Sequence, residues 1–368
     1  MLFCKNCFKD KEIANIISSS SYKTIGDCPV CKSVETILYN SEKQEGLKPY
    51  FADLLSIYSP SSFLPKSYPI KEQYTLAEEL GSKRWDLFVD RITNEQINEI
   101  VRSICSEDYT VPSSLFKEKV GFSDISTEDY LKDIYLVKDN DWNQFVNDIK
   151  TKNRYHTKHI NLDILREYCG LMVKTYKTGT VFYRARISER DGYPISQMSA
   201  PPVGKSSAGR ANAGGITCLY LADEEKTALH EVRAAQFDFV SIAEFRARRN
   251  ITIVNLRDIA KISPFAENVN LVSYAINKRL LAKLDSEISK ALRRSDSYLD
   301  YVPTQYIVDY IRSIEDENGY QLYDGIEYNS TTAPGGFNLA IFEPDLFEGI
   351  SVSVHDICEI DYKYSKVM

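Results

Sequence analysis

The chain has 368 residues, of which 43% are hydrophobic and 26% are charged, and its formal net charge is -7. This composition is that of an ordinary globular protein long enough for two domains, and it excludes long disordered regions. The acidic balance argues against a broad nucleic-acid-binding surface, which needs an excess of basic residues. The chain begins without the apolar core of a signal peptide and has no apolar run of membrane-spanning length, so we expect a cytoplasmic protein.

Two cysteine pairs lie near the N-terminus, Cys4 with Cys7 and Cys28 with Cys31. In a reducing compartment cysteines stay as thiols, and two C-x2-C pairs supply the four sulfur ligands of a tetrahedral zinc site. Because the protein provides all four ligands, no position is left for water, which predicts a structural Zn2+. The alternatives are four unrelated buried cysteines or a redox pair in CPVC.

The middle of the chain has a helical period. Apolar residues repeat at helical spacing from about 46 to 110, and a further helix is expected over 161–176. These patterns predict three segments, a zinc ribbon over 1–45, a helical domain over 46–178 and a third domain over 179–368.

A short basic stretch, RYHTKH, precedes the helix predicted over 161–176, and in it four residues separate Arg154 from His159. An arginine and a histidine arranged in this way could bind a phosphodiester and move a proton. A solvated basic loop is the simpler interpretation, because so short a pattern often arises by chance.

After residue 180 short strands and helices mix without regular βαβ alternation, which predicts an α+β fold. Alternation predicts a strand over 180–187, with Arg184 on one face. A loop rich in glycine, proline and serine follows, and then a strand over 218–222 and a helix over 224–236 with Asp223 as its N-cap. The remaining expected elements are strands near 237–244, 251–256, 324–330 and 336–344, a helix over about 271–292 and another starting near Pro303.

Three residues on these elements could form a ligand site. Arg210, in the Gly-rich loop, offers a planar fork for phosphate, and Tyr220 on a strand could stack on an aromatic ring. Glu231 on the following helix could stabilise positive charge on a ribose as a glycosidic bond breaks. Together they suit a nicotinamide dinucleotide consumed as substrate, since the sequence lacks the G-x-G-x-x-G fingerprint of a hydride-cofactor site. Each also has a simpler interpretation, as a surface arginine, a half-buried tyrosine and a glutamate at a helix start.

The run GRANAGGITCLYLADEEKTALHEV, with YRARI before it and DGIEYNSTTAPGGFNLAIF after it, resembles a RES domain. RES domains are similar in fold to ADP-ribosyltransferases, and many are toxins that deplete cellular NAD+. The resemblance implies four catalytic residues, Arg210, Tyr220, Glu231 and Ser330. It also implies that two further residues bind NAD+, Arg184 and Asn338.

The N-terminal half resembles the helical region, with paired CxxC motifs, that precedes RES domains in a group of bacterial proteins. That region is assigned to the HEPN group, whose ribonuclease members use an R-x4–6-H motif. Arg154 and His159 fit this spacing, so the resemblance implies a ribonuclease as an alternative activity.

The resemblance to RES domains implies a cytoplasmic toxin or defence effector that cleaves the nicotinamide–ribose bond of NAD+, by hydrolysis or phosphorolysis. If a protein side chain were the acceptor, the same site would be an ADP-ribosyltransferase. Two rival functions are the HEPN-type ribonuclease and a non-catalytic interaction protein that docks through its zinc ribbon. The expected partners are NAD+ and, because such an enzyme needs restraint in its own cell, an antitoxin or immunity protein. A homo-oligomer is also compatible with the sequence, whereas a membrane or nucleic acid is not expected.

Overall fold

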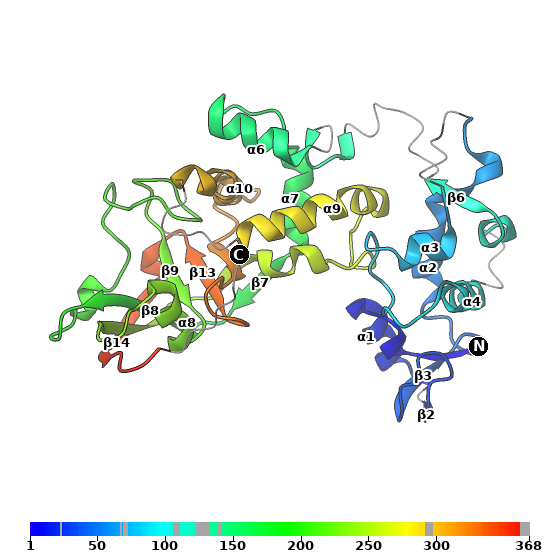
Figure 1. Ribbon diagram of the computed structural model, residues 1–368, viewed down its shortest axis with the longest axis horizontal. Coiled ribbons are helices and arrows are strands. Elements are labelled where there is room, and N and C mark those ends of the chain that lie inside the picture. The colour runs from blue at the N-terminus through cyan, green and yellow to red at the C-terminus, as the bar shows by residue number, and fades with distance from the viewer. Residues whose placement is uncertain are drawn as a thin grey trace, which may run out of the picture. The chain divides into compact units, whose positions relative to one another are not determined.

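The computed structural model describes residues 1–22, 24–66, 68, 73–105, 111–122, 133–138, 141–290 and 297–360 (Figure 1). Two compact units make up the chain. The N-terminal unit comprises residues 1–139 and 261–279, and the C-terminal unit comprises residues 140–260 and 280–368.

The N-terminal unit begins with a small antiparallel sheet in the order β1-β3-β2. Its elements are β1 (Leu2–Cys4), α1 (Lys11–Ser19), β2 (Thr24–Gly26) and β3 (Thr36–Asn40). Helix α1 starts at Asp10, whose carboxylate accepts a hydrogen bond from the Ile13 amide, and it buries Ile13 and Ile17 on one face.

Helices and a second small sheet follow in the N-terminal unit, so the segment predicted to be helical also contains strands. The sheet has the order β4-β6-β5. The elements are α2 (Lys48–Ser56), β4 (Tyr58–Pro60), β5 (Tyr74–Thr75), α3 (Leu76–Gly81), α4 (Asn94–Ile104) and β6 (Lys119–Phe122). Helices α3 and α4 each begin with a capping box, Thr75 with Glu78 and Thr93 with Gln96, which fixes where they start.

The C-terminal unit is built on an eight-stranded mixed sheet with the order β14-β10-β8-β9-β13-β12-β11-β7. Its strands are β7 (Val173–Tyr176), β8 (Val181–Ser188), β9 (Leu219–Ala222), β10 (Phe239–Ala247), β11 (Ile251–Asn255), β12 (Gly325–Asn329), β13 (Phe337–Ile341) and β14 (Phe347–Asp356). The β11–β12 pair is parallel and the other neighbours are antiparallel. A large mixed sheet with helices confirms the predicted α+β class.

Helices also belong to this unit. They are α6 (Trp142–Thr151), α7 (Leu162–Leu171), α8 (Glu225–Val232), α9 (Leu271–Ile288), which begins in the N-terminal unit, and α10 (Val302–Ser313). Helix α8 packs on β8, β9 and β10, and α10 packs against α6 and α7 (Figure 1). Among the described residues, no helix combines the length and the apolar character needed to cross a bilayer.

The two faces of the sheet differ in character. One face carries a large apolar core that includes Phe182, Leu221, Phe245 and Ile341. The other face, under α8, is lined by smaller residues such as Ala185, Ala222 and Val240. Small side chains there let α8 approach the strands closely, and α8 carries Glu231.

Two sequence predictions about element boundaries are wrong. The helix expected over 161–176 ends at Leu171, and residues 173–176 instead form β7, which pairs with β11. Asp223 is not the N-cap of α8, because its amide donates to the Phe337 carbonyl and so continues the β9–β13 pairing. Helix α8 therefore begins after Glu224, and its C-cap is Arg233, which has a left-handed backbone with φ of 51°.

Candidate functional site

A cavity of about 590 Å3 opens in the C-terminal unit. Five of the six residues predicted there from the sequence line it, Arg184, Arg210, Tyr220, Glu231 and Asn338. The sixth, Ser330, contacts Glu231 directly. The structure therefore brings together residues that are up to 154 positions apart in the sequence.

Three donors hold the carboxylate of Glu231. Its Oε1 accepts hydrogen bonds from Ser330 Oγ at 2.6 Å, from Asn338 Nδ2 at 2.9 Å and from Thr332 Oγ1 at 3.0 Å. Because the three bonds share one oxygen, they fix the orientation of the side chain and leave Oε2 for a ligand. Glu231 itself is exposed at the cavity, so a ligand can reach it.

Arg184 is a cation without a carboxylate partner among the described residues. Its Nη1 donates to the Tyr220 carbonyl at 3.0 Å, and its buried Nε has no hydrogen-bond acceptor in the part of the chain that the structure describes. Strands β8 and β9 pair only at Tyr183 and Ala222 within the described part of the sheet, which leaves that carbonyl free to accept. Burial, with a contribution from Arg186, lowers the pKa of Arg184 to about 10, so the guanidinium stays charged at neutral pH. A half-buried cation with an unsatisfied Nε favours an anionic ligand.

Arg210 borders the cavity, but its guanidinium already has partners. Nη1 donates to the Ile288 carbonyl and Nη2 donates to the Lys290 carbonyl at 2.9 Å, at the C-terminal end of α9. A cation is favourable there because the helix dipole places negative charge at that end. The guanidinium carbon also lies 5.8 Å from the centre of the Tyr328 ring.

A hydrogen-bond network holds the Gly-rich loop that carries Arg210. The Tyr220 hydroxyl donates to Asn212 Oδ1 at 2.6 Å and accepts from the Ala211 amide at 3.0 Å. Gln305 Nε2 donates to the carbonyls of Gly209 and Asn212. Burial raises the pKa of Tyr220 well above its usual range, so the hydroxyl is neutral. Tyr220 therefore uses its hydroxyl to hold the loop, and its ring is the part left for a ligand.

Several residues at the cavity were missed by sequence reasoning, among them Thr332 and Tyr328. Thr332 stands two positions after Ser330 in NSTTAPGG, but hydroxyl residues are common in loops and give a weak signal. Tyr328 could have been found from strand alternation, because it lies two positions before Ser330 in β12 and faces Asn338 across the β12–β13 pair. Burial raises its pKa.

Arg154 and His159 lie between α6 and α7 and do not line this cavity. His159 Nε2 is 2.8 Å from Asp148 Oδ2, whereas Arg154 donates its Nε to the Ile149 carbonyl at 3.5 Å. Lys152 first, and His159 second, hold the pKa of Asp148 below its ordinary value. The structure thus pairs the histidine with a carboxylate.

The four N-terminal cysteines converge. The Sγ atoms of Cys4 and Cys31 are 3.4 Å apart, those of Cys7 and Cys28 are 3.7 Å apart, and all four lie within 4.8 Å of one another. Bonds of about 2.3 Å to a tetrahedral zinc ion place sulfur atoms about 3.8 Å apart, so the thiols fit such an ion. These buried cysteines could bind a metal.

The cavity thus combines a carboxylate that three donors fix with the guanidinium groups of Arg184 and Arg210. A family comparison matches residues 181–364 to the RES domain, which is half of the chain, and the chain belongs to the RES domain family. This family is associated with NAD+-related toxin function. No curated protein and no solved structure matches the chain.

Proposed function

We propose that the C-terminal unit binds NAD+ in this cavity and breaks the bond between its nicotinamide and ribose. The observation that carries the proposal is Glu231, which three donors hold beside a cavity bordered by Arg184 and Arg210. A fixed carboxylate stabilises positive charge that develops on a sugar carbon, and arginines suit a pyrophosphate. On this proposal the unit has an ADP-ribosyltransferase-like fold.

Cleavage proceeds by loss of the nicotinamide. The bond between ribose C1′ and the nicotinamide nitrogen breaks with its electron pair moving to the ring, so nicotinamide leaves uncharged. Positive charge then forms at C1′, where Glu231 Oε2 stabilises it. Arg184 has the larger share in binding the pyrophosphate, because the guanidinium of Arg210 is already bonded to two carbonyls. The Tyr220 ring stacks on nicotinamide, and Ser330 and Asn338 keep Glu231 oriented.

The acceptor decides the product. Water attacks C1′ and loses a proton to give ADP-ribose, and phosphate gives ADP-ribose 1-phosphate. A protein side chain as acceptor makes the enzyme an ADP-ribosyltransferase.

The test follows free nicotinamide during incubation of the purified protein with NAD+, with and without phosphate. We expect release by the wild type and a loss of about 100-fold or more in Glu231→Gln, because the neutral amide cannot stabilise the cationic centre. Glu225→Gln is the matched control, since Glu225 is an exposed glutamate on the same helix and should keep activity within about twofold. Equal release by the Glu231→Gln variant would falsify the proposal.

A ribonuclease centred on His159 is the second candidate, and the Asp148–His159 pair favours it because a carboxylate can orient a catalytic imidazole. Arg154 would bind the phosphodiester. This candidate predicts RNA cleavage that survives Glu231→Gln and disappears in His159→Ala, so one set of variants separates the two activities.

We propose three further assignments. The four N-terminal thiolates hold a structural Zn2+, in a ribbon that precedes a HEPN-like helical domain. The protein acts in the cytoplasm as a toxin or defence effector, and an antitoxin or immunity protein restrains it. Measuring the bound metal in protein purified without added metal tests the first of these assignments.

A further inference from the structure

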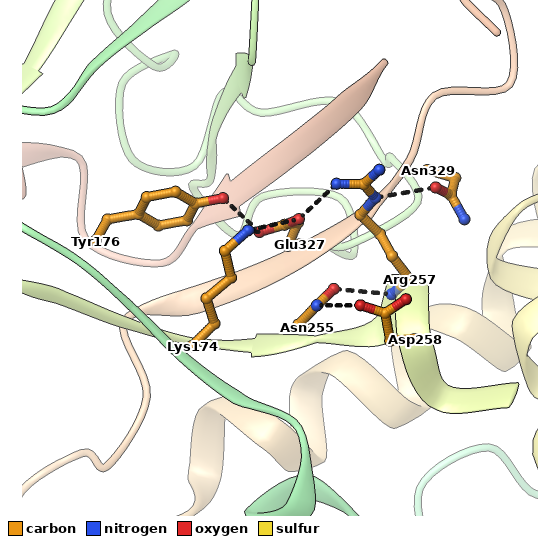
Figure 2. A network of polar contacts seen from close by, with 7 residues as sticks. All are labelled: Lys174, Tyr176, Asn255, Arg257, Asp258, Glu327 and Asn329. Carbon is orange, nitrogen blue, oxygen red and sulfur yellow. Dashed lines mark hydrogen bonds and ion pairs between the residues drawn. The ribbon is translucent and has the colours of Figure 1, made fainter. Parts of the chain in front are cut away.

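A second polar cluster surrounds Glu327 (Figure 2). The side chain of Glu327 is 0% exposed. Its carboxylate accepts from Lys174 Nζ at 2.9 and 3.1 Å, from the Tyr176 hydroxyl at 2.5 Å and from Arg257 Nη1 at 2.9 Å. Burial and the neighbouring Glu327 raise the pKa of Tyr176, which keeps that hydroxyl protonated as a donor. Two cations and one hydroxyl group therefore compensate the buried negative charge of Glu327.

Arg257 reaches beyond Glu327 to both strands of one hairpin. Its Nε donates to Asn329 Oδ1 at 3.0 Å, at the end of β12 (Figure 2). Its guanidinium carbon lies 4.5 Å from the centre of the Phe337 ring, at the start of β13. Asn329 and Phe337 are direct partners in the β12–β13 pairing. The guanidinium of Arg257 thus contacts both Asn329 and Phe337, the last residue pair before the hairpin loop.

That hairpin carries all three donors to Glu231. Ser330 directly follows Asn329, Asn338 directly follows Phe337, and Thr332 lies in the loop between them. The Ser330 amide donates to the Gly336 carbonyl at 2.9 Å and so closes the loop. Because side chains alternate along a strand, Asn329 and Phe337 face away from the cavity, which Tyr328 and Asn338 line.

We propose that Arg257 is a positioning residue for the cavity, holding the β12–β13 hairpin from the opposite face of the sheet. The hairpin also packs tightly on α8, since a Cβ at Gly336 would lie 2.3 Å from Thr227 Oγ1, one turn before Glu231. A shift of the hairpin base therefore changes how Ser330, Thr332 and Asn338 meet Glu231. Misplacement of a catalytic group by about 1 Å can cost about 100-fold in rate.

Three variants separate positioning from general stability. Arg257→Met removes all the polar contacts of the guanidinium. Arg257→Lys keeps a cation for Glu327 but loses the planar fork that also reaches Asn329. Arg249→Met is the matched control, because Arg249 makes a bidentate contact with Asp324 at the other end of β12, at 2.6 and 3.0 Å.

The first measurement is hydrogen exchange of peptides covering 328–338, and it does not depend on any activity. We expect about tenfold faster exchange there in Arg257→Met, a smaller increase in Arg257→Lys and none in Arg249→Met. Unchanged exchange in both Arg257 variants would show that the side chain does not hold the hairpin, and it would overturn the proposal.

The second measurement rests on the proposed function and compares kcat with KM for nicotinamide release. We expect kcat to fall about tenfold or more in Arg257→Met with KM within about twofold, and an intermediate kcat in Arg257→Lys. A kcat equal to that of Arg249→Met would also overturn the positioning role. If the wild type released no nicotinamide, the proposed function would fail, and hydrogen exchange alone would decide whether Arg257 holds the hairpin.

Discussion

Gly209 is a position where a single methyl group would disturb the cavity. A Cβ there would lie 2.6 Å from the Tyr220 hydroxyl oxygen and 2.7 Å from Asn212 Oδ1, the two atoms whose hydrogen bond holds the Gly-rich loop. Such distances are below van der Waals contact, so one of the two side chains must move.

We therefore expect Gly209→Ala to reduce nicotinamide release by about tenfold or more, because Tyr220 and the loop carrying Arg210 lose their common hydrogen bond. Gly214→Ala is the matched control in the same loop, since the nearest atom to its Cβ would be the Ala208 amide nitrogen at 4.0 Å. Initial rates for both variants check this expectation. Equal rates would show that the Tyr220–Asn212 contact does not matter for activity.

Sequence reasoning found the residues of the cavity better than it found their contacts. Residue chemistry, supported by a family resemblance, supplied Arg210, Tyr220 and Glu231, and the structure brings them to one cavity. The bonds from Arg210 to the carbonyls of Ile288 and Lys290 join residues 78 and 80 positions apart. Such contacts depend on the path of the whole chain, which local patterns do not encode.

Helix α3 offers a test at the scale of an element, because its two adjacent glutamates titrate in opposite directions. Glu79 is 5% exposed, its nearest cation is Arg84 at 3.8 Å, and burial raises its pKa. In the capping box Glu78 accepts hydrogen bonds from the Thr75 amide at 2.7 Å and from the Thr75 hydroxyl at 2.9 Å. These two bonds lower the pKa of Glu78.

The effect of pH on the stability contributed by each glutamate follows from linkage between protonation and folding. The folded state favours protonated Glu79, so its contribution to the free energy of unfolding is fully present below the unfolded pKa of about 4.3 and is lost as pH rises through the raised folded value. Glu78 behaves in the opposite way, since its contribution is present at neutral pH and is lost as pH falls through the lowered value.

We expect Glu79→Gln to be more stable than the wild type at pH 7.5 and Glu78→Gln to be less stable, with both differences shrinking at pH 4. For Glu79, each unit of pKa shift corresponds to about 1.4 kcal/mol. Urea unfolding followed through the fluorescence of Trp85, which donates to the Tyr58 hydroxyl beside Glu79, measures both variants. The same sign of change in the two variants would contradict this account.

Elements were predicted well where local pattern and packing agree. The strand over 180–187 and the helix over 271–292 appear as β8 and α9 with small shifts at their ends. Residues 173–176 were misassigned because Val173 and Tyr176 continue a helical spacing, while pairing with β11, about 75 residues later in the chain, makes them a strand. Pairing between distant segments overrides local preference in such cases.

At the scale of the whole molecule, the α+β class followed from the mixture of elements, but the strand order did not. The parallel neighbours β11 and β12 are separated by about 70 residues that include α9 and α10. This arrangement places every residue that lines the cavity in the C-terminal unit, whereas all four clustered cysteines belong to the N-terminal unit.

Metal removal should therefore affect the two units differently. A structural zinc site contributes about 10 kcal/mol or more of binding free energy to folding, so Cys28→Ser or chelation should unfold the ribbon around the four cysteines. Nicotinamide release should stay within about twofold, because no described residue of the ribbon lines the cavity. Hydrogen exchange of peptides from 1–45 and from 181–360 tests whether the ribbon alone unfolds. The rate of nicotinamide release, measured on the same sample, tests whether activity is kept. Loss of activity together with the metal would instead show that the N-terminal unit controls the C-terminal site.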